Sequence, residues 1–132
     1  MSDTTATIDR YPTTWTQAKR DLRCPRGSRT VWLSSRAMPR QHSAGLVYDV
    51  TGPSGDDVLT VQVWSGMLPL RVLAGNVVVV LGSPWGNVVE VSEAARESTT
   101  IAVAQGCKAT LYGADPALVN GSARTILFDG AR

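Results

Sequence analysis

From Gly45 onward the chain repeats one pattern, in which short apolar runs rich in Val, Ile, Leu and Thr are separated by clusters of Gly, Pro, Asn and Asp. Such runs between turn residues are typical of β-strands. Most runs start about 7 to 12 residues after the previous one, which is the spacing of β-sandwiches and barrels. The sequence therefore predicts an all-β fold, a single sandwich or barrel of about eight strands. The expected strands are Leu46–Thr51, Val58–Ser65, Leu70–Ala74, Val77–Leu81, Val88–Ser92, Thr99–Ala104, Lys108–Tyr112 and Arg124–Phe128.

Two of these runs indicate how the strands are covered. In Val58–Ser65 apolar side chains alternate with the others, so one face of this strand is expected to be buried. In Val77–Leu81 both faces are apolar, which predicts the core on one side and a second layer or a subunit on the other. An exposed strand of this composition would promote aggregation.

The four residues Gly-Asn-Val-Val occur at 75–78 and again at 86–89, eleven residues later. Gly and Asn tolerate a positive φ, so both copies suit a turn that leads into a strand. Two copies are too few to predict a solenoid, and successive hairpins of the same construction are the expectation.

The first part of the chain has a different character, which predicts a basic N-terminal arm at residues 1–44 and a β domain at residues 45–132. Thr14 begins a capping box, and the run before Pro25 has apolar residues on one helical face. The extended arm is therefore expected to contain one short helix, followed by a strand at Thr30–Ser34.

The charge of the chain is unevenly distributed. Residues 1–42 hold eight basic and three acidic side chains, and the rest holds five basic and eight acidic ones, so the arm is cationic although the net charge is only +2. Arginine pairs with acidic groups and stacks on flat rings. The favoured partner is an acidic patch on a neighbouring protein subunit, and the alternatives are nucleic acid and the chain's own acidic β domain. The predicted partner-binding residues are Arg20, Arg23, Arg26, Arg29, Trp32, Arg36, Arg40 and Trp85.

Trp85 lies at the tip of a glycine-flanked turn, where a large ring either contacts another chain or folds back over the sheet.

The sequence contains few of the groups that catalysis requires. His42 is the one histidine, and no cysteine or histidine spacing of a metal site and no phosphate-binding glycine loop occurs. We therefore expect no catalytic residues, no metal, no cofactor and no enzymatic activity. Cys24 and Cys107 are expected to be free thiols in a reducing compartment.

A basic arm beside a β body, with strand edges that need partners and no catalytic set, predicts a structural or assembly protein that binds other subunits in an oligomer or larger array. In layout the chain resembles small virion proteins of bacteriophages, such as capsid decoration, minor capsid and head–tail connector proteins. That resemblance implies a place in a virion. The alternative is a nucleic-acid-binding β-barrel of the OB or SH3-like kind, with Trp32 or Trp64 as a stacking platform. The polar N-terminus predicts no secretory signal, and no run is apolar enough for a membrane partner, so a chain of non-viral origin is expected in the cytoplasm.

Overall fold

The computed structural model describes residues 18–33, 46–64, 69–84 and 86–128, with only the backbone at residues 18–20 and 46. This part of the chain consists mostly of strands, which form a six-stranded sheet A and a five-stranded sheet B. Sheet A contains β1 (Ala18–Arg23), β3 (Leu46–Thr51), β5 (Leu70–Ala74), β7 (Asn87–Val91), β9 (Ala109–Tyr112) and β11 (Thr125–Phe128). Sheet B contains β2 (Arg29–Leu33), β4 (Leu59–Val63), β6 (Val77–Leu81), β8 (Thr99–Val103) and β10 (Val119–Asn120). The described residues also form two short 3-10 helices between strands, η3 (Glu93–Ser98) and η4 (Pro116–Leu118).

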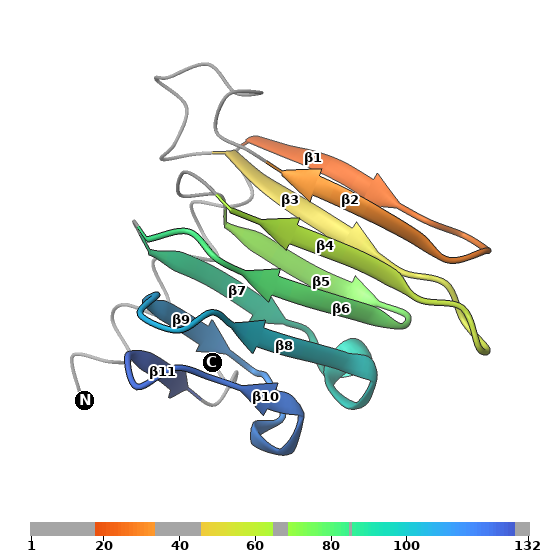
Figure 1. Ribbon diagram of the computed structural model, residues 1–132. Coiled ribbons are helices and arrows are strands. Elements are labelled where there is room, and N and C mark those ends of the chain that lie inside the picture. Colours follow the sequence, from red (N-terminus) through yellow and green to blue (C-terminus); the bar gives the residue numbers. More distant parts are fainter. Residues whose placement is uncertain (1–17, 34–45, 65–68, 85, 129–132) are drawn as a thin grey trace.

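The chain passes alternately through the two sheets. Each strand pairs in parallel with the strand two places further along, so the order is β1-β3-β5-β7-β9-β11 in one sheet and β2-β4-β6-β8-β10 in the other. The strands of sheet A run in one direction and those of sheet B in the opposite one (Figure 1). This path is a two-sheet parallel β-solenoid, in which one coil consists of a sheet A strand, a corner and a sheet B strand.

The prediction of a sandwich or barrel of about eight strands with a separate arm is therefore wrong. The sheets are purely parallel and do not close into a barrel, and the described residues form eleven strands. The arm is corrected as well, because β1 pairs with β3 and β2 pairs with β4. Residues 18–33 thus form the first coil of the solenoid and do not extend away from it.

The positions of the individual strands were predicted better than their arrangement. All eight expected strands are confirmed within a few residues, and so is the strand expected at Thr30–Ser34, which is β2. The predicted helix is wrong over its described part, because Ala18 and Leu22 belong to β1. The apolar residues of this segment are spaced as on one face of a helix, but the segment forms a strand because it pairs with β3. This pairing places Leu22 against the core. The rest of the predicted helix lies outside the described residues.

The repeated Gly-Asn-Val-Val segments are corners of the solenoid and not hairpin turns. The copy at 75–78 leads from sheet A into sheet B, and the copy at 86–89 leads from sheet B into sheet A. Eleven residues is therefore half a coil. At the first of these corners Gly75 has a φ of 88°, and a Cβ there would overlap the backbone of Gly52 in the preceding coil. Only glycine satisfies both conditions.

The two asparagines of these segments tie neighbouring coils together. The Asn76 side chain donates to the carbonyl oxygens of Gly55 and Asp57, at 2.8 and 3.0 Å. The buried Asn87 side chain donates to the carbonyl oxygens of Ser83 and Lys108, at 3.0 and 2.8 Å. Each amide therefore satisfies backbone groups that the change of sheet leaves without a ladder partner.

The core lies between the sheets, where aliphatic side chains of successive coils stack in rows. Each fully buried Val, Leu or Ile contributes about 1.5–3 kcal/mol relative to an exposed one. The strands present these side chains at every second position, so the intervening residues form the two outer faces of the solenoid. One row of sheet B is Val31, Val61, Val79, Ile101 and Val119, and one row of sheet A is Tyr48, Leu70, Val89 and Leu111.

Candidate assembly surface

The outer face of sheet B carries no charged side chain in the part of the chain that the structure describes. Its strands bury alternate residues, and the residues between them point away from the core. Strand pairing arranges these residues in two rows, which we call the B face together with Trp64. The first row is Thr30, Thr60, Val78 and Thr100, and the second is Trp32, Gln62, Val80, Ala102 and Asn120.

Two exposed tryptophans lie close together on the B face. Trp32 pairs in register with Gln62, and Trp64 follows two residues further along the same side. The Trp64 indole N–H donates to the Gln62 amide oxygen at 2.8 Å, and its benzo ring lies across Gly82 of the next coil, where a Cβ would overlap it. The Trp32 and Trp64 side chains are 63% and 44% exposed. Large exposed rings on an uncharged surface are typical of binding sites.

The first coil also carries three exposed arginines at and beside the corner between its two strands. Arg23 ends β1, Arg26 lies in the corner between β1 and β2, and Arg29 begins β2. The ion pair between Arg71 and Asp49 does not involve these three guanidinium groups, and no ion pair of theirs occurs within the described ranges. Arg29 pairs with the inward-facing Leu59, so it lies on the opposite side of β2 from Trp32, and Arg23 lies on the outer side of sheet A.

The corner that presents Arg26 is fixed to the second coil. Gly27 N–H donates to Asp57 Oδ2 at 3.0 Å, and the Val58 N–H donates to Ser28 Oγ at 3.1 Å. The buried Cys24 thiol donates to the carbonyl oxygen of Gly27 at 3.4 Å. These contacts hold the corner in one conformation, so binding through it would cost less conformational entropy than binding through a free arm.

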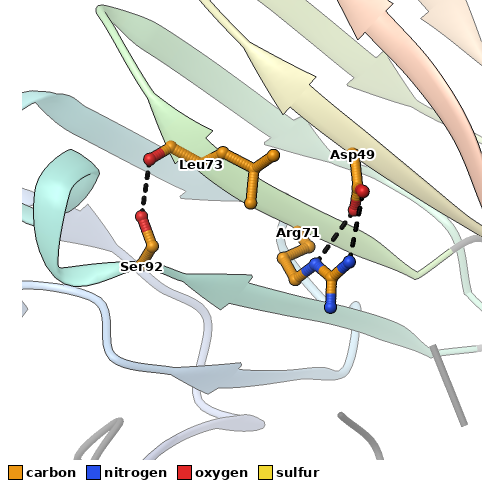
Figure 2. A network of polar contacts seen from close by, with 4 residues as sticks. All are labelled: Asp49, Arg71, Leu73 and Ser92. Carbon is orange, nitrogen blue, oxygen red and sulfur yellow. Dashed lines mark hydrogen bonds and ion pairs between the residues drawn. The ribbon is translucent and has the colours of Figure 1, made fainter. Parts of the chain in front are cut away.

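The outer face of sheet A is different, because it contains the ion pair (Figure 2). Asp49 of β3 is only 4% exposed, and both of its oxygens accept hydrogen bonds from the Arg71 guanidinium, at 2.9 and 3.1 Å. Ser92 Oγ donates to the Leu73 carbonyl oxygen at 2.7 Å on the same side of the sheet. Asp21 of β1 and Glu90 of β7 lie in the same outward row as the ion pair, so this face carries charged side chains where the B face carries none.

The structure places four of the residues predicted to bind a partner on one coil, but on different sides of it. Arg23, Arg26, Arg29 and Trp32 all lie on the first coil, and the backbone of Arg20 lies in β1. The remaining predicted residues, Arg36, Arg40 and Trp85, and also His42, lie outside the described residues.

Sequence reasoning did not name Gln62 as a binding residue, and it named Trp64 only as a stacking platform in the nucleic-acid alternative. The alternation in Val58–Ser65 already placed both on one side of a strand, and this was the available signal. That Trp32 lies beside them depends on the pairing of β2 with β4, which a local pattern does not contain.

Both cysteines are buried and unbonded. Within the described ranges, no three His, Cys, Asp or Glu side chains are grouped as metal ligands. Those ranges also contain no helix long and apolar enough to cross a membrane. Comparison of the chain with protein-family models, curated proteins and solved structures found no match.

Proposed function

We propose that this protein is a non-enzymatic assembly protein that binds neighbouring protein subunits through the first coil and the adjoining B face. The observation that carries the proposal is the exposure of Trp32, at 63%, on a face without charged side chains. Trp and Arg are the most frequent anchors of protein interfaces, and charged residues are depleted at interface centres. The exposed Arg26 and Arg29, at the corner that leads into β2, suit the rim of such an interface, whereas Arg23 lies on the outer side of sheet A.

The proposal is made at the level of an assembly protein. The likeness to small virion proteins depended on a layout with a separate basic arm, and the described part of that arm, residues 18–33, forms the first coil. A place in a virion, as a capsid decoration, minor capsid or head–tail connector protein, thus stays a prediction from sequence.

The test is the mass of the protein in solution, measured by sedimentation velocity over a concentration series. We expect the wild type to sediment as a species heavier than the 14.1 kDa chain. Replacing Arg23, Arg26 and Arg29 with Ala, or Trp32 with Ala, should lower that mass while the circular dichroism spectrum is kept. Matched controls on the last coil are Arg124→Ala and Ile126→Ala, which remove an exposed arginine and an exposed apolar residue. A monomeric wild type, or unchanged assembly in the first-coil variants, would contradict the proposal.

Single-stranded nucleic acid is a second candidate partner. Trp32 and Trp64 share a face, and three exposed arginines lie on the adjoining corner, a combination that suits base stacking and phosphate contacts. The predicted OB or SH3-like barrel is not the observed fold, so only the side chains support this candidate. A shift assay with random DNA and RNA over a salt series tests it. Binding should weaken steeply as salt rises, and no binding at low salt would exclude it.

A further inference from the structure

The B face is divided by its central strand into a bulky half and a small half. Strand β6 is the middle strand of sheet B, and it presents Val78 and Val80 outward, both partly exposed. On the β2–β4 side lie Trp32, Gln62 and Trp64, and on the β8–β10 side lie Thr100, Ala102 and Asn120.

This division makes the face complementary to itself. A two-fold axis along β6 would place the bulky half of one copy over the small half of a second copy, and the same in reverse. Val78 and Val80 would then meet their own counterparts at the axis. Because the face has no charged side chain, two copies meet without like-charge repulsion.

We propose that the occupant of the B face is a second copy of this chain, docked about a two-fold axis close to the direction of β6. This inference rests on the proposed assembly function and names one of its partners. The proposed contact also supplies the second cover that the apolar strand Val77–Leu81 requires. Two sheets packed in this way lie about 10 Å apart.

The size of the face sets the expected strength of the dimer. Five strands and five residues per strand span about 24 Å by about 17 Å, so each copy contributes roughly 400 Å². The two copies together bury less than the roughly 1,200–2,000 Å² of a stable interface, and the dimer is therefore weak and concentration-dependent. Association should appear at protein concentrations on the order of 10–100 µM.

Charges placed on the axis test the proposal. In Val80→Glu two carboxylates face each other across the axis, so dimerisation should weaken about tenfold or more, and Val80→Lys should do the same. An equimolar mixture of the two variants should dimerise again, because the charges then have opposite signs. The matched control is Val88→Glu, which puts the same change on the outer face of sheet A and should leave dimerisation unchanged. Sedimentation velocity measures all four samples.

Crosslinking tests the direction of the axis. Thr60 and Thr100 occupy one row on either side of β6, so rotation about β6 brings Thr60 of one copy over Thr100 of the other. A mixture of Thr60→Cys and Thr100→Cys, treated with a short bis-maleimide, should give several times more crosslinked dimer than either variant alone. The wild type is the control, because its two cysteines are buried.

The outcomes separate this inference from the function on which it rests. If the arginine variant lowers the mass but Val80→Glu does not, the chain assembles through the corner of the first coil and the B-face dimer is overturned. If the Glu and Lys variants fail to restore each other, or crosslinking is equal in single and mixed samples, the proposed axis is wrong.

Discussion

The two outer faces of the solenoid are built from strands of similar length, yet the face of sheet A carries charged side chains and the described face of sheet B carries none. On sheet A, Asp49 is 4% exposed and is held by Arg71. On sheet B the described outward residues are uncharged, and Trp32 is 63% exposed. A face that stays in water normally carries charged side chains. The comparison therefore teaches that the exposed, uncharged face is the one that requires a partner, whereas the other face carries charged side chains and its ion pair is satisfied within the chain.

The largest expected effect comes from breaking the ion pair of sheet A. Asp49→Leu leaves the Arg71 guanidinium beside an apolar side chain, and the free energy of unfolding should fall by about 3 kcal/mol. The double variant Asp49→Leu with Arg71→Met removes both charges and should recover most of that loss. Urea denaturation measures both. A loss below about 1 kcal/mol in the single variant would show that the pair is effectively solvated and that the contrast between the faces is smaller than the structure indicates.

A smaller effect is expected where Trp64 lies on sheet B. In Gly82→Ala the new methyl group occupies the position of the Trp64 ring, which must move away and lose its hydrogen bond to Gln62. We expect a loss of about 1–2 kcal/mol in unfolding free energy and a shift of tryptophan emission to longer wavelength. Gln62→Ala is the control that removes the hydrogen bond but leaves the space free, and it should cost about 1 kcal/mol or less. Equal effects of the two variants would contradict the packing of the ring on Gly82.

The smallest effect on stability is expected at Thr100, an exposed residue of the B face. Thr100→Val keeps the β-branched shape at an exposed position of the B face and removes one hydroxyl group. The free energy of unfolding should stay within about 0.5 kcal/mol of the wild type. Self-association should become stronger, since the face becomes more apolar. Weaker association, measured by sedimentation velocity, would argue that this half of the face meets water or a polar partner.

The strand positions were predictable because the period of a strand is a local property. Runs such as Leu46–Thr51 and Leu70–Ala74 have the same bounds in the sequence prediction and in the structure. Strand β1 was missed because Ala18 and Leu22 also fit one face of a helix, and only pairing with β3 decides between the two. Strand β10 has two residues, too few for any pattern.

The solenoid itself was not predictable from a repeat, because its coils differ in length. Arg29 pairs with Leu59, thirty residues on, whereas Leu59 pairs with Val77, eighteen residues on, and Val77 with Thr99, twenty-two residues on. Because the corners differ so much in length, the sequence has no fixed repeat length that would indicate a solenoid. The four residues repeated at 75–78 and 86–89 were a true sign of the coil, but they mark half of it and so were interpreted as hairpins.

The candidate surface was likewise predictable within one strand but not between strands. The sequence by itself determined which side chains share a face of one strand, such as Gln62 with Trp64, since neighbouring residues of a strand point to opposite sides. Only the tertiary structure decided which strands lie side by side, and with them the neighbours Trp32 with Gln62 and Asp49 with Arg71. The physical reason is that a corner such as Gly75-Asn76 sends the chain into the other sheet, so strands pair with partners a whole coil away, and that choice depends on backbone contacts between coils.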